Sequence, residues 1–267
     1  MRFSVRLLVQ SYCRCYNLHN INQTMANKTV LVTGAAKRLG AGLARYLHGQ
    51  GMDIILHYHH SQDEAQVLAD ELSELRDGSI LTVMGDLRDP DAPRQIISAA
   101  AQFKGHLDVL INNASVFYPT PLEHATLSQW DESITVNMRA PYFLTKEAAS
   151  YLRIAKGCII SIADIHADRP LYNYSIYCAS KAGLVMLTRA LARELGPAIR
   201  VNAVAPGAIL WPESMPISKQ NDILDRTVLK QAGSTDDIAK AIRYLILDGD
   251  YITGQVLTVD GGRTLYS

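Results

Sequence analysis

Short hydrophobic runs alternate with longer segments of helical pattern from residue 29 onward. The runs are almost continuously hydrophobic rather than alternating, which is typical of parallel strands with helices on both faces. They span residues 29–33, 53–57, 80–84, 107–111, 157–162, 200–205 and 256–259. Strands that alternate with helical segments indicate crossover connections. We therefore predict an α/β fold, with a single doubly wound domain whose seven-stranded parallel sheet is flanked by helices.

Between the predicted strands, helical patterns are clearest at residues 40–50, with Gly51 placed just past the helix end, and at residues 64–75. Residues 210–231 lack a regular pattern, and we expect an irregular segment that forms a lid. The predicted domain covers residues 25–267. No internal repeat or low-complexity tract interrupts it.

Residues 1–24 differ in composition from the rest of the chain. They carry Arg2, Arg6 and Arg14, no acidic residue, and an apolar patch at residues 7–9 that is too short for a secretory signal. Two explanations remain open: a mitochondrial-type presequence, or sequence upstream of a true start at Met25. We favour the second, because the fold pattern begins only a few residues after Met25, and we expect this N-terminal extension to be disordered.

Composition and charge narrow the class of protein. The chain has 267 residues, of which 48% are hydrophobic and 19% charged, and its 26 basic residues balance 26 acidic ones. Without a net charge, nothing draws the whole molecule to nucleic acid or an anionic membrane. No apolar run of about 20 residues exists to span a bilayer. The four cysteines, which we expect to be reduced thiols of a cytoplasmic protein, are Cys13, Cys15, Cys158 and Cys178.

A glycine turn follows the first predicted strand. It reads Thr33-Gly34-Ala35-Ala36-Lys37-Arg38-Leu39-Gly40. At this point of a βα unit, the pyrophosphate of a dinucleotide meets the N-terminus of a helix. Gly34 permits the tight turn and Gly40 permits close packing of the helix, while Lys37 and Arg38 can clamp phosphate. A solvated surface pair is the alternative for the two cations, since the spacing departs from the common G-x-G-x-x-G.

The end of the second predicted strand carries no carboxylate. A domain that selects NAD places an acidic residue there to bind the ribose hydroxyls, but this chain reads His57-Tyr58-His59-His60-Ser61. An acid would repel a 2′-phosphate, so these side chains together with Arg38 favour NADPH. A histidine-rich metal site is the alternative, and we expect none because no carboxylate or thiol completes a ligand set. Asp86, followed by Leu87 after the third strand, is a candidate acceptor for the adenine amino group.

A tyrosine and a lysine share one helix face after the fifth predicted strand. The sequence there is Tyr177-Cys178-Ala179-Ser180-Lys181, and residues four apart are neighbours on a helix surface. A free phenol has a pKa of about 10, and a nearby ammonium favours its ionised form. The pair therefore predicts a Tyr177 that acts as an acid or base, with a pKa lowered by Lys181.

In combination, these motifs resemble the short-chain dehydrogenase/reductase family. Their order along the chain is the glycine turn, Asn112-Asn113-Ala114, Asn137, the Tyr177/Lys181 pair and Pro206-Gly207. The resemblance implies a Rossmann fold, a homotetramer, and cofactor contacts from Asn113, Ala114, Ser115, Pro206 and Gly207. It also implies that Tyr177 protonates the reduced centre, that Lys181 binds the nicotinamide ribose, and that Asn137 holds a proton-relay water.

One position departs from the common pattern of that family. Where a serine usually stands, thirteen residues before the tyrosine, this chain has Asp164. A carboxylate suits a substrate that offers N–H donors or needs a proton delivered to a ring nitrogen. This departure, the Arg38 turn, His57-Tyr58-His59 and the stretch from Asn112 to Leu122 resemble the pteridine reductase branch.

The resemblance to that branch implies where a pterin would lie. The ring would stack on Phe117, and Ser115, Asp164 and Tyr177 would reach its polar edge; ordinary loop packing is the alternative role for Phe117. Leu210 is a further candidate substrate contact. The residues after Gly207 differ from the small polar pattern of protozoan pteridine reductases, and the chain lacks their final arginine. Biopterin, dihydrofolate and dihydromonapterin therefore all remain candidate substrates.

Two other functions remain open. A carbonyl reductase of the same family, acting for example on a 3-oxoacyl thioester, would be expected to have serine at position 164. A sensor that binds NADPH without turnover would not need the set of Asp164, Tyr177 and Lys181.

Overall fold

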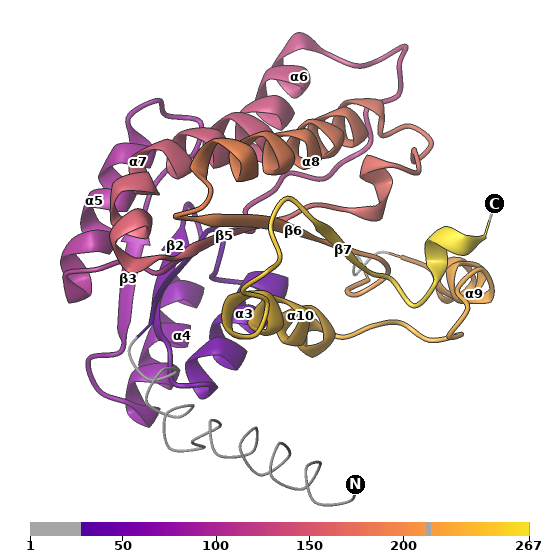
Figure 1. Ribbon diagram of the computed structural model, residues 1–267. Helices are drawn as coiled ribbons and strands as arrows, with labels where there is room; N and C mark the ends of the chain where they lie inside the picture. Colours follow the sequence, from indigo (N-terminus) through magenta and orange to yellow (C-terminus); the bar gives the residue numbers. More distant parts are fainter. Residues whose placement is uncertain (1–27, 212–214, 267) are drawn as a thin grey trace, which may run out of the picture.

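The computed structural model describes residues 28–211 and 215–266, so the predicted extension of residues 1–24 lies outside the described residues. Its strands form one parallel sheet in the order β3-β2-β1-β4-β5-β6-β7 (Figure 1). They are β1 (Thr29–Val32), β2 (Asp53–Tyr58), β3 (Ile80–Met84), β4 (Val109–Asn112), β5 (Cys158–Ile162), β6 (Arg200–Pro206) and β7 (Val256–Val259). The predicted fold class, a doubly wound α/β domain with a seven-stranded parallel sheet, is confirmed.

Helices cover both faces of this sheet (Figure 1). They are α3 (Arg38–Gly49), α4 (Gln62–Leu75), α5 (Ala92–Lys104), α6 (Leu127–Ile134), α7 (Ala140–Ala155), α8 (Ser175–Leu195), α9 (Ile217–Asp225) and α10 (Thr235–Leu247). Short turns are η1 (Thr135–Arg139), a π-helix, and the 3₁₀ turns η2 (Ile165–Ala167) and η3 (Arg263–Leu265). No described helix combines the length and hydropathy needed to cross a bilayer.

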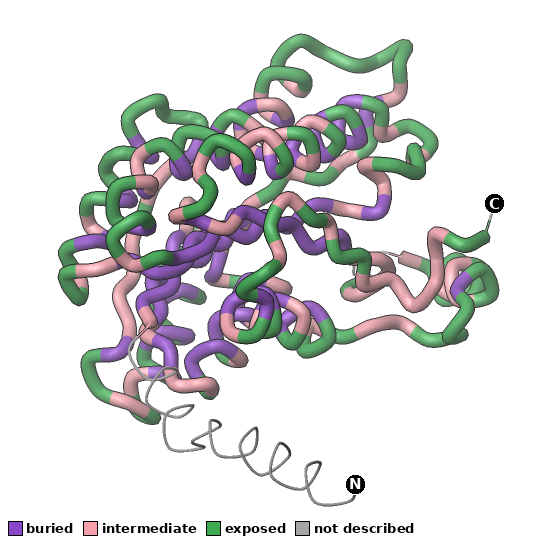
Figure 2. The backbone as a smooth tube through the Cα atoms, viewed as in Figure 1, coloured by how far each residue is buried: buried purple, intermediate pink, exposed green. Residues whose placement is uncertain are grey.

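Alternate side chains of each central strand enter opposite cores. Val30 and Val32 of β1 pack with α3, α4 and α10, whereas Leu31 between them packs with α5, α7 and α8. This follows from the two-residue repeat of a strand, and it explains why the central strands read as unbroken hydrophobic runs. Figure 2 shows the central strands of the sheet as buried, whereas no residue of the edge strands β3 and β7 is buried.

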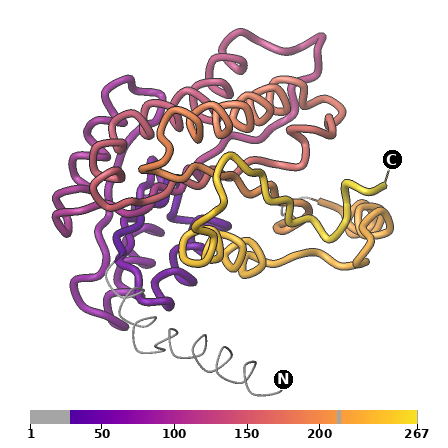
Figure 3. Tube along the Cα trace, in the orientation of Figure 1, coloured from indigo at the N-terminus to yellow at the C-terminus, as the bar shows by residue number. Residues whose placement is uncertain are grey.

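Most predicted boundaries agree with the structure to within two residues. Strands β3 and β7 match in full, α3 begins two residues before the predicted helix, and Gly51 adopts φ +90° past its end. The predicted irregular segment at residues 210–231 is wrong in part, because it contains α9. With nine residues, none of them buried, α9 is too short for a helical period to be recognised in the sequence. Figure 3 shows the C-terminal segment beside α9, where Arg263 donates to the carbonyl oxygen of Arg226 at 3.1 Å.

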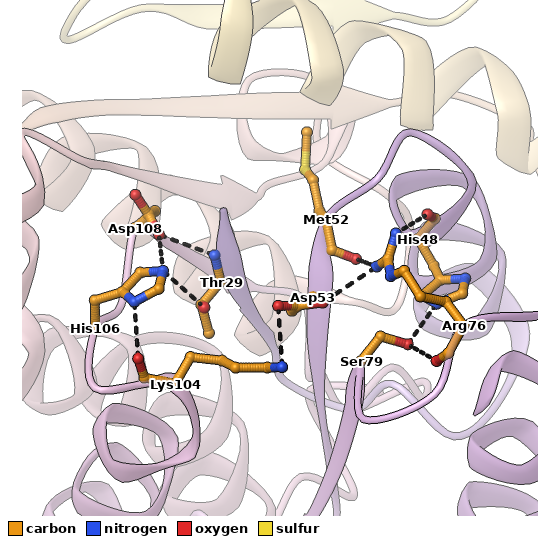
Figure 4. A network of polar contacts seen from close by, with 9 residues as sticks. All are labelled: Thr29, His48, Met52, Asp53, Arg76, Ser79, Lys104, His106 and Asp108. Carbon is orange, nitrogen blue, oxygen red and sulfur yellow. Dashed lines mark hydrogen bonds and ion pairs between the residues drawn. The ribbon is translucent and has the colours of Figure 1, made fainter. Parts of the chain in front are cut away.

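Polar contacts secure the amino ends of the strands (Figure 4). Asp53, at the start of β2, pairs with Arg76 at 3.3 Å and Lys104 at 3.5 Å. Asp108 accepts a hydrogen bond from the backbone N–H of Thr29 at 2.9 Å and lies 3.3 Å from His106. These contacts anchor loops to one edge of the sheet, and the candidate site lies at the other.

Candidate active site

A cavity of about 1060 Å³ lies along the carboxyl ends of the strands, where doubly wound sheets bind their ligands. Its walls gather nearly all of the predicted site residues from separate parts of the sequence. These are Gly34, Lys37, Arg38, Leu39, Gly40, His57, His59, His60, Asp86, Leu87, Asn113, Ala114, Ser115, Phe117, Asp164, Tyr177, Lys181, Pro206, Gly207 and Leu210. Three predicted residues, Tyr58, Ser61 and Asn137, are not among the residues that line it.

The glycine turn has the backbone geometry that phosphate binding requires. Gly34 adopts φ +62°, and a Cβ at Gly40 would collide with the carbonyl oxygen of Gly34. The side-chain amide of Asn113 donates to the carbonyl oxygens of Thr33 and Gly34 at 2.8 and 3.0 Å. The turn is therefore held against the end of β4, with α3 starting directly behind it, and this shape fits the pyrophosphate of a dinucleotide.

His57 connects two loops of the cofactor end instead of projecting freely into it. Its Nδ1 accepts from the backbone N–H of Gly34 at 3.2 Å, so its Nε2 carries the hydrogen and donates to the carbonyl oxygen of Gly85 at 3.1 Å. Burial lowers the pKa of His57 to about 4, which keeps the ring neutral and this tautomer fixed. The side chain is 2% exposed. It therefore acts as a brace between the glycine turn and the loop before Asp86.

Two basic side chains and a histidine line the part of the cavity where the adenosine ribose would lie. Lys37 pairs with Glu64 at 2.5 Å, and Arg38 donates to the carbonyl oxygen of Leu210 at 3.5 Å. His59 lies 3.5 Å from Asp86. Because these contacts are part-exposed and made by long or mobile side chains, an entering phosphate can compete for them.

Asp86 is hydrogen-bonded to Arg88, a residue that the sequence analysis did not predict as part of the site. Arg88 donates to both carboxylate oxygens of Asp86, at 2.9 to 3.1 Å. These bonds hold the pKa of Asp86 at about 2. An adenine amino group would therefore share a carboxylate that Arg88 keeps ionised.

Asp164 and Tyr177 form a direct hydrogen bond within the cavity. The Tyr177 hydroxyl donates to Oδ2 of Asp164 at 2.6 Å, while Oδ1 accepts from the backbone N–H of His166 at 2.8 Å. Burial, together with the adjacent Asp164 carboxylate, raises the pKa of Tyr177 well above its usual value. The predicted lowering by Lys181 is therefore wrong for this structure, because burial and the adjacent Asp164 carboxylate both disfavour the phenolate.

Lys181 and Asn137 lie next to this pair and are held by their own hydrogen bonds. Lys181 donates to the carbonyl oxygen of Ile162 at 2.8 Å, its Nζ lies 5.7 Å from the centre of the Tyr177 ring, and burial lowers its pKa to about 8. Asn137 accepts from Ser115 Oγ and Val116 N at 3.0 and 2.9 Å. Its amide also donates to Val116 O at 3.1 Å and to the hydroxyl of Ser180, beside Lys181, at 3.0 Å.

Phe117 lies among aromatic rings at the substrate end of the cavity. It stacks on Tyr174 with ring centres 4.7 Å apart and meets Tyr177 edge-on at the same distance. Phe117 nevertheless remains 49% exposed. Loop packing and a role in ligand stacking are thus both compatible with its position.

Several residues that line the cavity were missed from the sequence. They are Arg88, Glu132, His166, Tyr174, Trp211, Lys219 and Arg263. Arg88 and Tyr174 lie within three residues of predicted site residues and could have been found by widening each motif. No local signal marks Lys219 of α9 or Arg263 of η3, because only the tertiary fold brings them to the cavity.

Comparisons with known proteins agree with this geometry. Residues 34–264 match the family described as Enoyl-(Acyl carrier protein) reductase. Pteridine reductase 1 of Leishmania tarentolae is 35% identical, over 88% of this chain and 96% of that protein. A 3-oxoacyl acyl-carrier-protein reductase of Staphylococcus epidermidis is 31% identical, over 88% of this chain and 98% of that protein.

A solved structure extends the similarity to three dimensions. The crystal structure of a blue fluorescent protein from a metagenomic library, in complex with NADPH, is 34% identical with a TM-score of 0.84. The match covers 90% of this chain and 98% of that chain. Sequence, fold and site thus lead to one conclusion: the chain belongs to the short-chain dehydrogenase/reductase family and is an NAD(P)-dependent oxidoreductase.

Proposed function

We propose that this protein reduces a pterin or dihydropterin ring with NADPH. The observation that carries the proposal is the carboxylate of Asp164, hydrogen-bonded to Tyr177 at 2.6 Å on the wall of the cavity. A carboxylate accepts hydrogen bonds but, when ionised, donates none. It therefore suits a ring that presents N–H groups and disfavours a plain carbonyl oxygen, which needs a donor.

The cofactor assignment rests on the hydrogen-bond donors at the ribose end. Arg38, His59 and His60 line that part of the cavity, and no carboxylate stands at the end of β2 to accept bonds from a free 2′-hydroxyl. A phosphate at the 2′ position would gain charge-assisted hydrogen bonds from these side chains. The structural relative in complex with NADPH supports the same choice.

The proton chemistry assigns separate tasks to the residues of the site. Bound NADPH supplies the hydride, which adds to a ring carbon of a C=N bond while NADPH becomes NADP⁺. Tyr177, kept protonated by its high pKa, delivers the proton to the ring nitrogen. Asp164 orients the phenol and binds ring N–H groups, and Lys181 holds the nicotinamide ribose. Phe117 offers a flat apolar face, against which a heteroaromatic ring is stabilised by stacking.

The test compares substrates and variants with one assay, NADPH oxidation. We expect turnover with dihydrobiopterin and little with a 3-oxoacyl thioester. Removing a general acid costs roughly 10² to 10⁴ in rate, so Tyr177→Phe should lose activity by that factor. Asp164→Ser should lose pterin reduction and retain any carbonyl reduction. Wild-type turnover of dihydropterin by either variant contradicts the proposal.

The 31% identity to a 3-oxoacyl reductase favours a second candidate, a carbonyl reductase acting on acyl thioesters. Thioester turnover well above pterin turnover in the wild-type chain supports that candidate. NADPH binding by calorimetry without turnover of any substrate would instead indicate a sensor.

A further inference from the structure

A second, small cavity lies beneath the active site, between the ends of β4 and β5 and helices α7 and α8. Its volume is about 10 Å³. Most of its lining is apolar, and side chains with polar atoms come from Asn112, Tyr142, Thr145, Ser161 and Thr188. Neither Asn112 nor Thr145 belongs to the machinery described above.

The polar atoms of Asn112 and Thr145 are buried without partners. Both residues are under 5% exposed. Among the described residues, nothing hydrogen-bonds to Nδ2 or Oδ1 of Asn112 or to Oγ1 of Thr145. An unpaired buried polar group is destabilising, and the large majority of buried side-chain polar atoms in proteins are paired. Three unpaired atoms around one cavity therefore call for a ligand.

Comparable residues show what is unusual here. The buried side chain of Asn202 uses both ends of its amide, donating to Ile252 O at 2.8 Å and accepting from Gln255 N at 3.0 Å. Thr188, in the same cavity wall, donates to Leu184 O one turn earlier at 2.9 Å, as threonine in a helix commonly does. Thr145 makes no such bond.

The donor and acceptor pattern defines the ligand. Nδ2 of Asn112 needs an acceptor, Oδ1 needs a donor, and the Thr145 hydroxyl can serve as either. A cation accepts no hydrogen bond and an anion donates none, whereas water does both. A cavity needs roughly 10–15 Å³ to hold one water with two to four polar partners, and this cavity is at that size.

We infer that one water molecule binds in this cavity and bridges Asn112 to Thr145. Asn112 directly precedes Asn113, whose amide holds the glycine turn. The water thus fastens the end of β4 to α7 and helps to fix the strand end from which the cofactor loop departs.

Two measurements test the site on the full chain. A crystal structure at high resolution should show a solvent peak at about 2.7–3.2 Å from Asn112 and from Oγ1 of Thr145, in the wild type and in Thr145→Ser, which keeps the hydroxyl. Thr145→Val keeps the shape and removes the hydroxyl. Since it breaks the bridge, we expect Tm to fall by about 2–4 °C.

Thr120→Val is the matched control. The Thr120 hydroxyl is likewise buried and unpaired among the described residues, but Thr120 does not line this cavity. Replacing an unpaired hydroxyl with a methyl should leave Tm unchanged or raise it. A wild-type map without the peak, or a Thr145→Val variant at least as stable as the wild type, overturns the inference.

Discussion

At the scale of single residues, the chemistry of the cavity depends on which neighbour the Tyr177 phenol meets. The family resemblance predicts that Asp164 and Tyr177 lie together at the substrate, and spacing predicts that Lys181 shares a helix face with Tyr177. Neither predicts whether the Asp164 carboxylate or the Lys181 ammonium has the larger effect on the pKa of Tyr177. In the structure, the phenol bonds to Asp164 at 2.6 Å, while Lys181 turns to Ile162 O. The direction of the pKa shift therefore depends on the burial of the phenol and on its contact with Asp164, neither of which sequence spacing encodes.

His57 provides a prediction at the same scale. Its pKa falls from 6.5 to about 4 on folding because the ring is buried. Below pH 6.5 the unfolded chain takes up a proton that the folded chain refuses, so stability falls as the pH drops from 6.5 to 4. The shift corresponds to roughly 3 kcal/mol.

Denaturant unfolding of the wild type and His57→Asn between pH 4 and 7 measures this effect. The variant loses the bond that spans to Gly85 and should be the less stable at pH 7. Because asparagine does not titrate, its free energy of unfolding should approach that of the wild type toward pH 4. A constant difference between the two across this range would mean that His57 is not the group responsible.

At the scale of elements, the π-helical turn η1 carries Asn137 out of the regular helical register. π-helical turns are rare in proteins, and those that occur are often found at functional sites. The turn places one side chain between the loop after β4 and helix α8, through four hydrogen bonds of 2.9 to 3.1 Å. The sequence marked Asn137 through the family resemblance. It did not mark the π turn, because only the tertiary contacts of Asn137 favour it over continuous α-helix.

We expect Asn137→Ala to lower both stability and cofactor affinity. It removes the hydrogen-bond partner of Ser115, Val116 and Ser180, of which only Ser180 is fully buried, and a buried polar group that loses its partner costs about 1–3 kcal/mol. The loop that follows β4 should loosen as a result, raising the KM for NADPH. Asn202→Ala is the control, since Asn202 is equally buried but bonds Ile252 and Gln255, away from the cavity. It should lose stability and keep its KM; equal KM changes in both variants would reject the positioning role of Asn137.

At the scale of the whole molecule, the parallel sheet explains why distant motifs meet. The carboxyl ends of β1 to β6 face one edge, so most of the predicted motifs, which follow these strands in the sequence, meet at the cavity. Residues from α9 and η3 could not be predicted, because their approach depends on how the C-terminal segment packs. The sequence also does not predict the role of the outer faces of α7 and α8, since an apolar residue there can belong to a core or to a subunit interface.

We expect the homotetramer that the family resemblance implies to use those outer faces. Phe143 and Ile154 of α7 lie eleven residues apart, close to three turns, and so share a face. They are 40% and 84% exposed, and Met186 of α8 is 59% exposed. Figure 2 shows both helices largely exposed along their outer sides. Large exposed apolar side chains gathered on one face mark interaction sites.

We expect light scattering on the full chain to give the mass of a tetramer, and Phe143→Glu to give a smaller species, because a buried unpaired charge opposes association. Val67→Glu is the control: Val67 is 67% exposed on α4, which packs on the opposite face of the sheet. That variant should keep the wild-type mass. Circular dichroism of each variant separates loss of assembly from loss of folding. A monomeric wild type, or a tetramer that Phe143→Glu leaves intact, would exclude this face as the interface.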